Sequence, residues 1–101
     1  MIKILITKEE KKITKIEIKG HANSAPYGED LVCAAVSAII TGCANNIQDY
    51  NSIRIKLDEG HATFDCSNEI SLHDEIVLET MVTALKTVEE GNEKFVKIQI
   101  L

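Results

Sequence analysis

The sequence predicts a single α+β domain over residues 1–101, in which two helices pack on a mainly antiparallel or mixed sheet. Period-two alternation of side chains marks five strands, and apolar residues at helical spacing mark two helices. These elements follow the order β-β-α-β-β-α-β. A chain of 101 residues is long enough to bury one hydrophobic core.

The first two strands form a predicted hairpin with isoleucine at alternate inward positions: Ile2, Ile4, Ile6, Ile16 and Ile18. The polar stretch 8–12 is typical of the turn between them. In the second hairpin, residues 53–58 alternate, Glu59-Gly60 turns the chain, and the returning strand points three residues inward: Ala62, Phe64 and Cys66. A last strand contains Phe95, Lys97, Ile98 and Ile100.

The first helix begins near Asp30 and carries one apolar stripe: Val32, Ala35, Val36, Ile39, Ile40, Cys43 and Ile47. Its other side is small and barely polar, which indicates burial on more than one side, against a second subunit. The second helix has Ser71 as its predicted N-cap, with Asp74 three residues on, and presents Leu78, Met81, Val82, Leu85 and Val88. Gly91 ends it as a C′ residue would.

Charge and hydropathy exclude several classes of function. A net charge of −5 argues against nucleic-acid binding, because a phosphate backbone is bound by clustered Lys and Arg. The one basic cluster, within residues 8–15, is interpreted as a solvated hairpin tip. There is no apolar run of membrane-spanning length and no secretory signal, so we expect a cytoplasmic protein without a membrane partner. An acidic surface instead suits basic partners.

A loop of small and polar residues, 20–29, joins the second strand to the first helix, and Gly20 and Gly28 are its expected hinges. Cys33 follows as the third residue of a helix capped by Asp30. In that first turn, unpaired amides and the helix dipole favour negative charge and therefore a reactive thiolate. From position alone, the ordinary interpretation of Cys33 is still a small core residue.

His21 stands at the other end of this loop, twelve positions before Cys33 (33 minus 21). Such a loop can bring its ends together, so that imidazole and thiol meet. A Cys-His pair is the minimum for thiol acyl transfer, because the base takes the proton and the thiolate attacks a carbonyl carbon. Backbone amides at Cys33 and its neighbours are the expected oxyanion hole. Without Cys33, His21 would be interpreted as a loop histidine that caps a carbonyl.

Two further residues of this region have alternative roles. Asp30 either caps the helix, which is the physical default, or orients His21 as a third catalytic residue. The two roles conflict, because a carboxylate near the sulfur opposes the thiolate. Ser37, one turn beyond Cys33, either hydrogen-bonds near the sulfur or bonds back to its own helix.

The motif around the candidate pair has two parts, Gly20-His21-Ala22 and Gly28-Glu29-Asp30-Leu31-Val32-Cys33-Ala34-Ala35-Val36-Ser37-Ala38. It closely resembles the signature of the ribosomal-processing cysteine protease (Prp) family, and the element order is similar to that family over essentially the whole chain. The resemblance implies a homodimeric cysteine endopeptidase with Cys33 as nucleophile and His21 as catalytic histidine. It also implies the substrate, large-subunit ribosomal protein twenty-seven, whose N-terminal extension is removed by cleavage after a phenylalanine.

Two other functions remain open from the residues alone. One is a ribosome-associated binding module in which Cys33 and His21 only shape a pocket. The other is a dimerisation domain that uses the small face of the first helix, formed by Ala34, Ala38 and Thr41. Replacing Cys33 by Ala separates the binding module from a protease, since only a protease would then lose its activity. Alkylation with iodoacetamide at neutral pH tests the dimerisation domain, in which Cys33 should react no faster than an ordinary thiol.

The remaining cysteines and histidines have ordinary interpretations. Cys43 and Cys66 belong to apolar faces and are expected in the core, and His61 and His73 are expected at solvated positions. Three cysteines without a C-x-x-C pair predict free thiols in the cytoplasm. A zinc site formed by His21, Cys33, His61 and Cys66 is conceivable, but no closely spaced ligand pair supports it, so neither a metal nor a cofactor is expected.

Overall fold

The structure is a computed structural model that describes residues 1–22, 25–26, 30–66 and 69–101. Its elements are β1 (Ile2–Glu9), β2 (Lys12–Lys19), α1 (Leu31–Asn45), β3 (Ile53–Asp58), β4 (His61–Cys66), α2 (Leu72–Glu89) and β5 (Val96–Ile100). The predicted element order is confirmed. The sheet is mixed, with strand order β3-β4-β2-β1-β5, in which only the β1–β5 pair is parallel.

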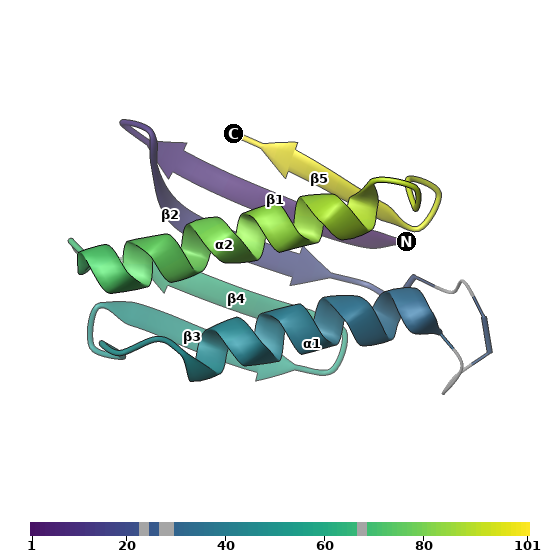
Figure 1. Cartoon of the computed structure of the whole chain (residues 1–101), viewed down its shortest axis with the longest axis horizontal. Coiled ribbons are helices and arrows are strands. Elements are labelled where there is room, and N and C mark those ends of the chain that lie inside the picture. Colours follow the sequence, from purple (N-terminus) through teal and green to yellow (C-terminus); the bar gives the residue numbers. More distant parts are fainter. Residues whose placement is uncertain (23–24, 27–29, 67–68) are drawn as a thin grey trace.

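Both helices lie on the same face of the sheet, and they run beside each other along the strands (Figure 1). The inward isoleucines of β1 and β2 and Phe64 of β4 form a continuous row, because Ile6 pairs with Ile16 and Ile16 pairs with Phe64. These three side chains are completely buried. The predicted inward faces of both hairpins therefore form the floor of the core, and the helices cover it.

The two hairpins differ in detail from the prediction. The first turn is shorter than residues 8–12, because Glu10 and Lys11 alone make it with left-handed φ angles of 51° and 69°. Two such residues match the twist of the flanking strands. In β3, burial fades along the strand, from Ile53 in the core to Leu57, which is 46% exposed. Leu57 lines an open cavity beside α1.

The helices begin where the capping residues predict. Asp30 is the N-cap of α1, and Ser71 is the N-cap of α2, where its hydroxyl accepts a hydrogen bond from the Asp74 amide. Gly91 follows the end of α2 with a φ of 85°, as a C′ glycine does. Neither α1 nor α2, the helices among the described residues, contains an apolar stretch of the length that a bilayer crossing needs.

The side chain of Asp74 has a role that its place in the capping sequence did not suggest. It is completely buried, and its two carboxylate oxygens accept hydrogen bonds from the amides of Gln48 (2.9 Å) and Asp49 (3.0 Å). These amides follow the end of α1. Asp74 therefore ties the first turn of α2 to the segment that leads from α1 into β3, and it fixes the two helices relative to each other.

Candidate active site

Cys33 lies in the first turn of α1, as predicted, and the cap of this helix uses its amide. The Asp30 Oδ1 atom accepts the Cys33 N–H at 3.0 Å, and the Asp30 carbonyl accepts the Ala34 N–H at 3.0 Å. Asp30 therefore caps the helix, which was the default interpretation. The consequence corrects one expectation: the Cys33 amide is already engaged in this structure, so it is not an open oxyanion donor.

The strand that leads to His21 ends at a glycine with tight surroundings. Gly20 has a φ of 96°, and its amide donates to the Gly60 carbonyl at 2.9 Å. A Cβ atom at Gly20 would clash with the carbonyl oxygen of Met1. A glycine is therefore needed here for both backbone conformation and space. The expected hinge function of Gly20 stays a prediction, and Gly28 lies outside the described residues.

His21 rests against the turn between β3 and β4. A Cβ atom placed on Gly60 would lie only 2.9 Å from His21 Nε2 and 3.4 Å from Cε1, so the imidazole occupies the space that a side chain would fill. His21 and Cys33 line the same cavity, of about 310 Å³. Both belong to the described residues, and no hydrogen bond joins them there. The structure thus brings the predicted pair into one cavity, with the imidazole placed by Gly60.

Ala22 links the histidine segment to the sulfur. Its backbone N–H donates a hydrogen bond to Cys33 Sγ at 3.2 Å, and its side chain is buried, with 3% exposure. Residues 20 and 21 therefore lie against the β3–β4 turn, and residue 22 contacts the sulfur on α1. The thiolate, and not the thiol, is the nucleophilic form of a cysteine. An amide N–H that points at the sulfur favours this negatively charged form.

The cavity lies between α1 and the second hairpin. Its wall on α1 contains Ser37, which is exposed one turn beyond Cys33, and its opposite wall contains Leu57 and the residues of the β3–β4 turn. A larger cavity of about 590 Å³ lies between the β1–β2 turn and the start of α2. Cys66 contributes to its wall, but no histidine among the described residues does. The carboxylates in that wall would oppose a thiolate rather than form a Cys-His pair with it, so the smaller cavity is the candidate active site.

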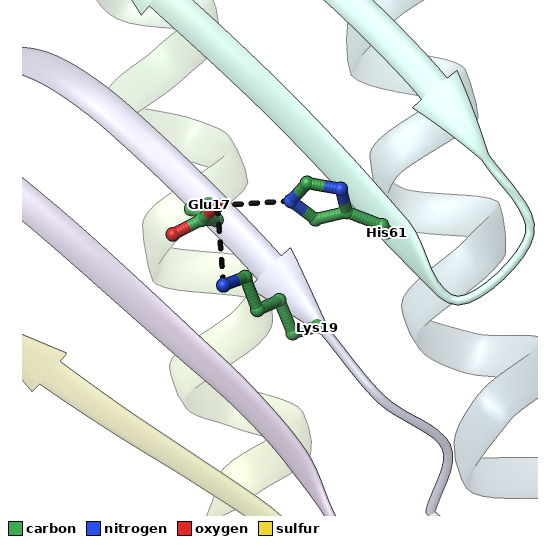
Figure 2. Close-up of polar contacts among 3 residues, drawn as sticks. All are labelled: Glu17, Lys19 and His61. Atoms are coloured by element: carbon green, nitrogen blue, oxygen red, sulfur yellow. Dashed lines mark hydrogen bonds and ion pairs between the residues drawn. The ribbon is translucent and has the colours of Figure 1, made fainter.

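Sequence reasoning missed a polar cluster on the face of the sheet that points away from the helices (Figure 2). His61 Nε2 lies 2.9 Å from Glu17 Oε2, and Lys19 Nζ lies 3.7 Å from the same oxygen (Figure 2). The hydrogen bond to His61 is the main cause that lowers the pKa of the Glu17 carboxyl below its ordinary value of 4.5. His61 also lines the cavity and is only 41% exposed, so it is not simply solvated. The sequence does place all three residues on outward faces of their strands. The contact between them could be predicted only from the pairing of β2 with β4, which the sequence does not give.

Burial disfavours the thiolate of the other two cysteines. Burial, with the nearby charges of Asp65 and Asp74, raises the pKa of the Cys66 thiol to about 11. Burial also raises the pKa of Cys43, which packs against the core. In the described part of the chain, no three His, Cys, Asp or Glu side chains gather closely enough to hold a metal ion. His61 and Cys66 lie at opposite ends of β4.

Comparisons with known proteins agree on one family. The sequence model of the family described as Cysteine protease Prp matches residues 1–97. The chain is 34% identical to the ribosomal processing cysteine protease Prp of Staphylococcus aureus strain Mu50, with 97% of each chain covered. It is 32% identical to the protein of the same name from Bacillus subtilis strain 168, with 79% of each covered.

Solved structures give the same result. The fold is similar to the essential ribosomal processing protease Prp from S. aureus in complex with a covalently linked product peptide. That match has a TM-score of 0.89 and 32% identity, and it covers all of both chains. The complex of the S. aureus protease with a substrate peptide matches with a TM-score of 0.78 and 29% identity, again over all of both chains.

Proposed function

This chain belongs to the cysteine protease Prp family, and on that premise we propose that Cys33 is its nucleophile and His21 its general base. One observation carries the assignment. Cys33 stands at the start of α1 in a cavity it shares with His21, and its Sγ accepts a hydrogen bond from the residue that follows His21. Burial raises the pKa values of Cys66 and Cys43, which disfavours the thiolate of each.

The proposed reaction is amide hydrolysis through a thioester. His21 takes the proton of Cys33, and the thiolate attacks the scissile carbonyl carbon. The imidazolium then protonates the leaving amine as the C–N bond breaks, and a water molecule, activated by the same imidazole, hydrolyses the thioester. No hydrogen bond joins the two described side chains in this structure, so the imidazole and the thiol must come closer together for the first step.

We propose that the substrate is a ribosomal protein, by analogy with the relatives, which are named for ribosomal processing. We expect removal of the N-terminal extension of large-subunit ribosomal protein twenty-seven, by cleavage after a phenylalanine. The net charge of −5 supports attraction of a basic ribosomal protein. Such a substrate places the enzyme in the cytoplasm.

The decisive experiment incubates the purified chain with the extended ribosomal protein and follows cleavage by mass spectrometry. We expect one cut in the wild type, none in Cys33→Ala, and a normal cut in the matched control Cys43→Ala, which removes a thiol outside the cavity. Cys33→Ala should still bind the substrate. Cleavage by Cys33→Ala would refute the nucleophile, and no cleavage by the wild type would refute the substrate.

The role of Asp30 has its own test. Asn caps a helix about as well as Asp, so Asp30→Asn keeps the hydrogen bond from the Cys33 amide and removes the charge. If Asp30 is only a cap, the variant cleaves at the wild-type rate or faster, because a negative charge near the thiolate is gone. A large loss of kcat with unchanged stability would instead make Asp30 an orienting residue for His21.

We also propose that the protein is a homodimer that uses the small face of α1. Ala34, Ala38 and Thr41 are all exposed in the single chain, although two of them are apolar. Light scattering coupled to gel filtration should give twice the chain mass of 11.2 kDa. Ala38→Glu should give the monomer mass, and a control charge on α2, Thr83→Glu, should not.

A further inference from the structure

The backbone amide of Ala22 has an unusual partner for a buried donor. Its N–H donates to Cys33 Sγ at 3.2 Å, and Ala22 is only 3% exposed. A neutral thiol is a weak acceptor, whereas buried amides normally pair with carbonyl oxygens or other strong acceptors. On α1, the amides of Cys33 itself and of the next residue are already used, because Asp30 accepts the N–H groups of both Cys33 and Ala34.

We propose that the Ala22 amide is a catalytic hydrogen-bond donor, which holds the Cys33 thiolate and then the oxyanion of the tetrahedral intermediate. This inference rests on the proposed function, in which Cys33 is the nucleophile. The amide gains little from a neutral thiol. A hydrogen bond to an ionised acceptor is about twice as strong as a neutral one, so the same contact strengthens when the sulfur loses its proton.

The Ala22 amide can stabilise both the thiolate and the oxyanion, because the negative charge moves only from Sγ to an oxygen two bonds away. The Sγ lone pair forms the S–C bond, and the π electrons of the carbonyl pass to its oxygen. This oxygen is bonded to the carbon that Sγ attacks, so it arises beside the sulfur and within reach of an N–H aimed at Sγ. Collapse restores the carbonyl and expels the amine, which takes its proton from His21, and the attack of water on the thioester repeats the oxyanion step.

The geometry around Ala22 is held before substrate arrives. Its side chain packs in the core, and two residues earlier the Gly20 amide is bound to the Gly60 carbonyl at 2.9 Å. On the other side, the Asp30 cap fixes the helical turn that carries Cys33. A donor that needs no rearrangement during the reaction is the arrangement that stabilises a developing charge most effectively.

The test replaces the amide with an ester. A synthetic peptide thioester of residues 1–32, with lactic acid in place of Ala22, is joined to residues 33–101 through the native Cys33 by chemical ligation. The ester keeps the methyl group and removes only the N–H. The same ligation with an unaltered peptide is the reference. A matched control carries the α-hydroxy acid analogue at Lys8, whose amide donates to the Leu101 carbonyl at 3.1 Å and lies at the far end of β1.

We expect the Ala22 ester to lower kcat on a peptide substrate by about 10²-fold, the scale of one lost oxyanion donor, with KM changed less than about twofold. Alkylation of Cys33 by iodoacetamide at pH 7 should slow several-fold. The Lys8 ester should change neither. Wild-type kcat and alkylation in a folded Ala22 ester would overturn the proposal. If the unaltered ligated protein cleaves nothing, the proposed function fails, and alkylation still decides whether the amide stabilises the thiolate.

A second measurement needs no chemical synthesis. In a ¹H–¹⁵N spectrum of the wild-type protein, the Ala22 amide proton should shift downfield as Cys33 ionises, and this shift should vanish in Cys33→Ala. The amide proton of Lys8 should stay constant in both proteins. An Ala22 signal that ignores the ionisation of Cys33 would contradict the proposed donor even if the ester protein fails to fold.

Discussion

Gly60 offers a direct test of whether the β3–β4 turn positions the catalytic imidazole. In Gly60→Ala, the new Cβ would lie 2.9 Å from His21 Nε2, which is closer than van der Waals contact allows, and 3.4 Å from Cε1. These atoms belong to the end of a rotatable side chain. The ring will therefore move rather than the backbone, and the effect will fall on catalysis more than on stability.

Two magnitudes follow from this geometry. Gly60 has a φ of 73°, and an alanine in left-handed conformation costs roughly 1–2 kcal/mol, so the variant should unfold at a modestly lower denaturant concentration. The ring must retreat by about half an ångström or more to restore normal contact. Since a misplacement of about 1 Å can cost about 10²-fold in rate, kcat should fall by about 10- to 100-fold, with KM little changed.

Gly91 supplies a matched control in the same chain. Its φ is 85°, so Gly91→Ala carries similar strain, but nothing lies within 4 Å of its added Cβ. Both variants are compared by urea denaturation and by peptide cleavage. We expect similar losses of stability and a loss of kcat in Gly60→Ala alone. Equal kcat values in the two variants would refute the positioning role of Gly60.

Three shorter predictions concern buried and paired groups. At pH 8, iodoacetamide should modify Cys33 and leave Cys66 intact in the folded protein, because a pKa of about 11 leaves about 0.1% thiolate; equal labelling in mapped peptides would contradict this. Asp74→Ala should lower the free energy of unfolding by about 3 kcal/mol in urea titrations, because two amides lose their acceptor, and a loss below about 1 kcal/mol would argue against the tie. His61→Ala should raise the pKa of Glu17 toward 4.5 in an NMR titration. A lowered carboxyl pKa stabilises the folded protein above about pH 4.5, and this stabilisation is lost as the pH falls. On acidification, the wild type should therefore lose more stability than the His61→Ala variant. A Glu17 pKa that is the same in both proteins would contradict the pairing.

The elements of this fold were readable from sequence because each has a strong local signal. The isoleucine alternation of β1 and β2 and the caps Asp30 and Ser71 are such signals, and the structure confirms them. Strand order was not readable, because it depends on contacts between segments far apart in the chain. For the same reason the Glu17–His61 contact and the place of Gly60 against His21 were missed, since both depend on where β4 lies.

The amide donor shows why local rules fail at this site. A helix N-terminus offers a few unpaired amides, and a capping side chain and an anionic ligand compete for them. The sequence predicted both an Asp30 cap and an oxyanion hole at Cys33, although the Cys33 amide can serve only one acceptor well. In the structure, the Asp30 cap accepts the hydrogen bond of the Cys33 amide. The amide that donates to the sulfur instead belongs to Ala22, which follows the end of β2. Asp30→Ala should therefore change the activity. It frees the Cys33 amide to hydrogen-bond an oxyanion, and it also loosens the helical turn that holds Sγ against the Ala22 amide.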